Sequence, residues 1–173
     1  MAREKVIPTG RERVLREDDF IVSKTNPKGI ITYGNLTFIE FSGYTEAELL
    51  GRAHNIVRHP DMPKAVFSLM WDVLKEGQEF FGYVKNLAKD GSHYWTFANV
   101  TPSLDEHGRL LGYFSVRRKP RKAGIETMEP IYRSLLETEQ RVSGKAGIAA
   151  AREQLLQILN EKGMSYHDFI FTV

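Results

Sequence analysis

The chain has 173 residues, a formal net charge of +2, 42% hydrophobic residues and 27% charged residues, which are ordinary values for one globular domain with extensions. It contains no cysteine, which excludes a disulfide framework, a thiolate metal site and a cysteine nucleophile. No apolar run approaches the ~20 residues that span a bilayer, and the charged N-terminus lacks the apolar stretch of a signal peptide. We therefore expect a soluble, cytoplasmic protein.

The first part of the chain reads as a charged segment followed by a hairpin. Residues 1–18 are mostly polar, and they form a frayed leader, a cap on the domain or a contact with a second copy. Residues 20–22 and 30–33 are short apolar runs on either side of the turn signal Asn26-Pro27-Lys28-Gly29. Two such runs around a turn predict a β-hairpin.

Three helices are expected next, each marked by its own start signal. Asn35 is a good N-cap for a first helix, which Gly43 ends. Thr45 and Glu48 have the spacing of a capping box, which predicts a short second helix. Pro63 suits the first turn of a longer third helix, which ends near Lys75.

The following residues alternate in the manner of strands. Residues 79–87, 92–102 and 110–116 predict three strands in an antiparallel meander, with Asp90-Gly91 as a favoured hairpin turn. A hairpin, several short helices and a meander indicate an α+β domain with a five-stranded antiparallel sheet. Short helices over one face of this sheet would leave a pocket between helices and sheet.

The composition changes after residue 119, so we divide the chain into residues 1–18, a domain at 19–119 and a helical extension at 120–173. The basic cluster at 117–122 is interpreted as a solvated strand end, because no aromatic residues alternate with it. Helices are predicted around 125–140 and 148–161, joined by a linker at 143–147. The first of these packs back on the domain or pairs in a dimer. The aromatic tail at 166–173 docks on the sheet or recruits a partner.

Several motifs resemble those of a PAS domain. They include Asp19 to Asn26, Gly29 to Asn35, Phe41 to Thr45 and the turn Lys89-Asp90-Gly91. The string from Val57 to Ala65 (VRHPDMPKA) is similar to one subgroup in particular, the sensor module of bacterial aerotaxis receptors. Met70-Trp71, Val84-Lys85-Asn86 and His93-Tyr94-Trp95 strengthen that match, which covers roughly residues 19–135.

The resemblance implies a PAS fold with flanking terminal helices and a non-covalently bound FAD whose redox state is sensed. It also shows a departure, because aerotaxis receptors continue into a transmembrane segment and a signalling shaft. We see neither in this sequence. The chain is therefore expected to be a stand-alone sensor or an excised piece.

A flavin needs an apolar slot, hydrogen bonds at its pyrimidine edge and compensation for its pyrophosphate. The slot has these candidates: Phe38, Val66, Met70, Trp71, Phe97 and Phe114. Asn86, Asn99 and Ser115 lie on the meander strands, where amides or hydroxyls can reach the ring edge. Each of the three is otherwise a surface strand position.

The candidates for the rest of the dinucleotide lie in the motif string. Arg58 suits phosphate or ribose, because its planar fork matches oxygen acceptors. Asp61 suits a ribose hydroxyl or holds His59, and it is also placed to cap the following helix. His54 and His59 are candidates for adenine contact, although a lone histidine is more often structural.

No catalytic chemistry is indicated, because the chain has no GxGxxG motif, no recognisable nucleophile–base pair and too few clustered ligands for a metal site. The first hypothesis is a non-enzymatic FAD sensor of redox state or oxygen. It would report to a signalling partner in trans or to a missing fused output domain, and act as a homodimer without binding nucleic acid. The alternatives are a haem sensor that uses His54 or His59, and a cofactor-free dimerisation scaffold.

Overall fold

The computed structural model describes residues 6–173, so the charged residues Arg3, Glu4 and Lys5 lie outside the described part of the chain. Five antiparallel strands form one open sheet in the order β2-β1-β5-β4-β3. Their bounds are β1 Ile21–Thr25, β2 Ile31–Gly34, β3 Phe80–Leu87, β4 His93–Leu104 and β5 Leu110–Arg118. The predicted α+β class and five-stranded antiparallel sheet are confirmed.

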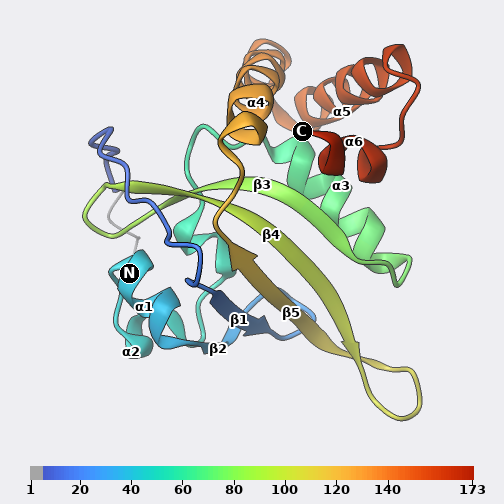
Figure 1. Ribbon diagram of the computed structural model, residues 1–173. Coiled ribbons are helices and arrows are strands. Elements are labelled where there is room, and N and C mark those ends of the chain that lie inside the picture. The colour runs from blue at the N-terminus through green and yellow to red at the C-terminus, as the bar shows by residue number, and fades with distance from the viewer. Residues whose placement is uncertain (1–5) are drawn as a thin grey trace.

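Four short helical elements follow the β1–β2 hairpin. They are α1 Leu36–Ser42, α2 Glu46–Leu49, the 3-10 helix η1 His54–Val57 and α3 Lys64–Lys75. The predicted caps are present: the Asn35 side chain accepts a hydrogen bond from the Phe38 N–H, and Thr45 forms a capping box with Glu48. These elements lie over one face of the sheet, as expected (Figure 1).

The C-terminal extension consists of three helices, α4 Lys122–Val142, α5 Gly144–Glu161 and α6 Tyr166–Thr172. The predicted linker at 143–147 is wrong, since only Ser143 separates α4 from α5. A Cβ on buried Gly147 would collide with the Glu139 carbonyl oxygen. The glycine that suggested a flexible linker is therefore a packing residue that lets two helices approach closely.

The three C-terminal helices lie together beside β3 and α3 (Figure 1). Tyr132 of α4 stacks on Trp95, with ring centroids 6.4 Å apart, and its hydroxyl donates to the Tyr83 carbonyl at 2.7 Å. Phe171 of α6 packs on Phe81 at 4.8 Å. Of the two alternatives for the tail, the structure shows docking on the sheet, and α4 likewise packs back on the domain.

The described part of the N-terminal segment is also packed against the domain. The Arg13 N–H donates to the His93 carbonyl at 2.8 Å, and Leu15 is only 2% exposed. Residues 6–18 are therefore a cap on the start of β4 rather than a frayed leader. Among the described residues no helix is both long and apolar enough to cross a bilayer.

Candidate functional site

A cavity of about 260 Å³ lies between the sheet and the segment from η1 to α3. Its lining comes from β1, β3, β4 and β5 on one side and from residues 53–71 on the other, so the predicted pocket between helices and sheet is present. The volume is slightly below the ~300 Å³ at which typical small-molecule pockets begin. It suits one fused ring system rather than a whole dinucleotide.

Most of the cavity wall is apolar. Phe67, Met70 and Trp71 of α3 face strand residues across the cavity. These strand residues are Val84, Ala98, Val100 and Tyr113. Trp71 meets Tyr113 edge to face at 5.2 Å between ring centroids, which is a favourable aromatic geometry. Met70 and Trp71, two of the residues that the sequence offered for an apolar slot, therefore line this cavity.

One end of the cavity is polar, and its hydrogen bonds centre on Ser23 of β1. Ser23 Oγ lies 2.9 Å from His54 Nε2 and accepts a hydrogen bond of 2.6 Å from Arg117 Nη2. Ser115 of β5 also lines the cavity. Burial, together with the Arg117 cation, lowers the pKa of His54 to about 3, so its imidazole is neutral. This end offers hydroxyl and guanidinium donors to a ligand.

Arg58 and Asn86 meet at the β3 side of the cavity. An isolated antiparallel bridge joins their backbones, and both line the cavity. The Arg58 guanidinium lies 4.0 Å above the centre of the Phe67 ring, and its buried Nε has no hydrogen-bond partner in the part of the chain that the structure describes. Burial lowers the pKa of Arg58 despite the field of Glu139. The Asn86 amide donates to Thr96 Oγ1 at 3.3 Å.

His59 and Asp61 do not line the cavity, although their neighbour Arg58 does. The Asp61 carboxylate accepts a hydrogen bond of 2.8 Å from Lys85 Nζ, which also lies 3.6 Å from Glu129 of α4. His59 Nδ1 accepts from the Asp61 N–H at 3.0 Å, and burial lowers the pKa of His59 to about 4. Burial opposes ionisation of Asp61, but the hydrogen bond from Lys85 and the charges of Lys85, His59 and His93 together outweigh it, so the pKa of the carboxyl group is lowered. The contact between Asp61 and Lys85 links residues 57–65 to α4, because Lys85 also lies close to Glu129.

Three further sequence candidates, Asn99, Phe38 and Phe97, lie away from the cavity lining. Asn99 is on the opposite face of the sheet, where its amide donates to Glu79 at 3.0 Å. Phe38 lies behind the polar end, stacked 5.7 Å from His54 and 4.7 Å below the Arg117 guanidinium. Phe97 packs against Phe171 at 5.8 Å on the far face of the sheet. Strand alternation explains both Asn99 and Phe97, because odd positions of β4 face away from Ala98 and Val100.

Sequence reasoning missed Arg117 because it was grouped with the basic cluster and interpreted as solvated. A usable signal was present, since residues two apart on a strand share a face and Ser115 was placed inward. Ser23, Lys28 and Asn55 also line the cavity and were not predicted.

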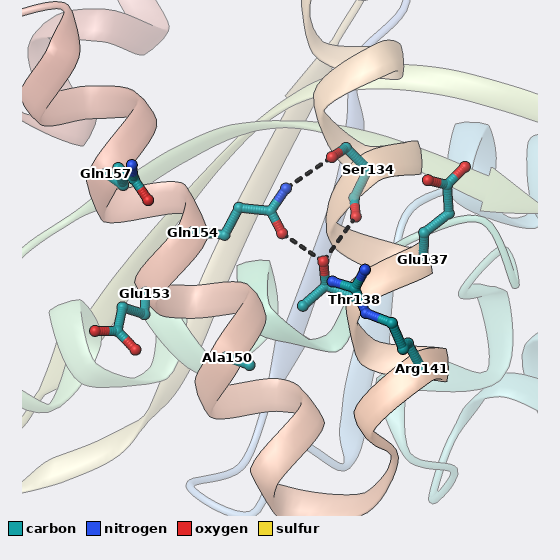
Figure 2. A pocket seen from close by; sticks show the side chains of 8 residues that line it. All are labelled: Ser134, Glu137, Thr138, Arg141, Ala150, Glu153, Gln154 and Gln157. Atoms are coloured by element: carbon teal, nitrogen blue, oxygen red, sulfur yellow. Dashed lines mark hydrogen bonds between the residues drawn. The ribbon is translucent and has the colours of Figure 1, made fainter.

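A second hollow of about 400 Å³ lies between α4 and α5. Figure 2 shows Gln154 of α5 bridging two residues of α4: its amide donates to Ser134 Oγ at 2.7 Å and its carbonyl accepts from Thr138 Oγ1 at 2.6 Å. These bonds satisfy the central polar groups and join the two helices. The cavity under α3 is therefore the better candidate for a ligand site.

Comparison with known proteins points to one family. The profile described as "PAS fold" matches residues 31–117. The aerotaxis receptor of Escherichia coli K12 is 45% identical over 127 residues, which is 73% of this chain and 25% of the receptor. A nitrogen fixation regulatory protein of Klebsiella pneumoniae is 31% identical over 56% of this chain and 20% of its own length. The chain thus spans a quarter or less of these relatives.

Among solved structures, the fold is similar to the one described as "Flavin Analogue Sheds Light on Light-Oxygen-Voltage Domain Mechanism". The TM-score is 0.56 at 22% identity, over 72% of this chain and 87% of the other.

The neutral state of His54 predicts a loss of stability in acid. The unfolded histidine takes up a proton near pH 6.5, whereas the folded one does so only at about pH 3. The stability contributed by neutral His54 is thus complete above about pH 6.5 and is lost as the pH falls toward 3. One proton corresponds to a slope of about 1.4 kcal/mol per pH unit.

Denaturant unfolding of the His54→Gln variant should show a shallower decline of unfolding free energy below pH 6.5 than the unchanged protein, by up to about that slope. The exposed His107→Gln variant is the control and should follow the unchanged protein. Parallel curves for the His54 variant and the unchanged protein would contradict the assignment.

Proposed function

The chain belongs to the PAS-fold family, and we propose that it is a sensor domain that binds FAD non-covalently and reports redox state or oxygen to a signalling partner. The observation that supports this most strongly is the cavity itself, which combines a flat apolar slot with a polar, cationic end. We propose no enzymatic reaction for it.

The residues of the cavity fit the demands of a flavin ring. Trp71, Met70 and Phe67 supply an apolar wall, and Asn86, Ser115 and Arg117 supply polar groups around it. A bound flavin would supply reversible electron transfer. The cavity has room for one ring system, so the exposed lining residues Lys28 and Asn55 are candidates to contact the remainder of FAD. Of the two candidates for the phosphate or ribose, Arg58 lines the cavity and Asp61 does not.

The relatives support this choice of cofactor and signal. The most similar of those described is named an aerotaxis receptor, and a solved structure with the same fold is described by its flavin analogue. Because the sequence contains no cysteine, a covalent cysteine–flavin adduct is excluded here. A redox or oxygen response remains as the proposed output of a bound flavin.

Strand β3 offers a route from the cavity to the C-terminal helices. Asn86 faces the cavity, whereas the adjacent Lys85 faces away and lies 3.6 Å from Glu129 of α4. A second link runs through Glu139 of α4, whose carboxylate accepts from the Ala65 N–H at 2.7 Å at the start of α3. We propose that α4 to α6 transmit the signal to a partner in trans, a fused output domain or a second copy in a cytoplasmic homodimer.

The visible spectrum of freshly purified protein, followed by chromatography of the released cofactor, tests the proposal. A flavin spectrum with FAD on release is expected. A sharp haem band would contradict it and direct attention to His54, because His59 lies outside the cavity. A colourless protein that takes up neither cofactor would favour the cofactor-free scaffold.

Two asparagines on the meander strands allow a matched test of the cavity. Asn86→Ala should weaken FAD binding by about tenfold or more, because it removes a buried hydrogen-bonding group from the cavity wall. Asn99→Ala changes the same residue type on the opposite face and should leave the affinity unchanged. Affinity is measured by titrating apo-protein with FAD and following flavin fluorescence. Equal losses in the two variants would place the site elsewhere.

A pair of lysines tests the route to the helices. Hydrogen exchange in α4 should differ between the oxidised and the reduced flavoprotein, and Lys85→Met should reduce that difference because it removes the link between Asp61 and Glu129. Lys89→Met is the control, since Lys89 is exposed and pairs with Glu48 instead. Identical exchange in both redox states of the unchanged protein would rule out this route.

A further inference from the structure

The candidate cavity has an excess of positive charge. Three cationic side chains line it, Lys28, Arg58 and Arg117, and none of its described lining residues is acidic. Buried charges in proteins are normally paired, because removing an ion from water is costly. Of the three, Lys28 is exposed to solvent and Arg58 lies in the field of Glu139. Arg117 is therefore the buried cation that lacks a carboxylate among the described residues of the cavity wall.

Arg117 shows the imbalance most clearly. It is only 2% exposed, and the hydrogen bond that its guanidinium makes within residues 6–173 joins Nη2 to Ser23 Oγ. Its Nε and Nη1 are buried and have no hydrogen-bond partner among the described residues, although a guanidinium carries five N–H donors. Its flat face lies 4.7 Å from the centre of the Phe38 ring. The free donors are available to a molecule in the cavity.

The groups around Arg117 do not neutralise it. His54 is uncharged, and the buried Tyr94 hydroxyl has no hydrogen-bond partner within residues 6–173. Burial lowers the pKa of Arg117 to about 10, which still leaves the guanidinium charged at neutral pH. The ligand-free protein therefore retains a buried cation whose desolvation is only partly compensated.

We propose that Arg117 is a specificity-determining residue, which selects a ligand with an electron-rich or negatively charged group at its buried end, at the expense of stability in the ligand-free protein. The carbonyl-rich pyrimidine end of a flavin is a group of this kind, so the inference rests on the proposed function for its probe. A purely structural arginine would instead stabilise the protein with or without a ligand.

Replacing Arg117 by Met separates these two roles, because Met has a similar length and suits the apolar contact with Phe38. Ligand-free Arg117→Met should melt about 2 °C or more above the unchanged protein, since an incompletely paired buried charge is removed. Its affinity for FAD should fall by about tenfold or more, since charge-assisted hydrogen bonds to the ligand are lost. Arg118→Met is the matched control: Arg118 is exposed, and neither quantity should change.

The proposal requires both changes in Arg117→Met: the melting temperature of the ligand-free protein must rise, and the affinity for FAD must fall. A variant that melts lower than the unchanged protein or fails to fold would show that Arg117 is structural. A variant that is more stable but binds FAD equally well would remove the ligand role. If the unchanged protein takes up no FAD at all, the proposed function fails, while the melting temperatures still decide whether Arg117 destabilises the ligand-free protein.

Discussion

The alternation of side chains along β3 is the constraint on which the rest of this structure depends. Neighbouring residues of a strand face opposite sides of a sheet. Here both sides are occupied, by the cavity and α3 on one side and by α4 and α6 on the other. Asn86 and Lys85 therefore connect two compartments through one peptide unit. Under the proposed function, a displacement of this part of β3 would change both the wall of the cavity and the contact of Lys85 with Glu129 of α4.

The segment from Arg58 to Ala65 contacts β3 in another way, because it begins at the outer edge of this strand. β3 is the last strand of the sheet, and an uncovered edge strand invites pairing with other chains. The bridge between Arg58 and Asn86 occupies part of that edge. Pro60 and Pro63 limit the backbone on either side of Asp61. One short stretch thus places Arg58 inside the cavity and Asp61 outside it, against Lys85.

The parts of the fold that were predicted correctly are those with local causes. Caps at Asn35 and Thr45, the turn at 26–29 and the meander strands depend on neighbouring residues, so their signals are complete within a few positions. The prediction of a linker at 143–147 was wrong because Gly147 was interpreted as flexible. A glycine is required there because a side chain would collide with the Glu139 carbonyl oxygen of the neighbouring helix. The prediction that Asn99 faces the cavity was wrong for a related reason. One face of β4 borders the cavity and the other packs against the C-terminal helices, so the alternation of apolar residues could not tell which face borders the cavity.

Arg117 shows why a ligand site is harder to predict than a fold. In sequence it belongs to a run of basic residues, and such runs are usually solvated; only the register of β5 against β1 places its side chain beside Ser23. The same register makes it a poor choice for a core, because it buries a charge with no carboxylate among the described residues of the cavity wall. Natural sequences break local rules of this kind mainly at functional positions. The contact with Phe38 accounts for the buried face of Arg117, whereas its charge finds a reason only in the ligand role proposed above.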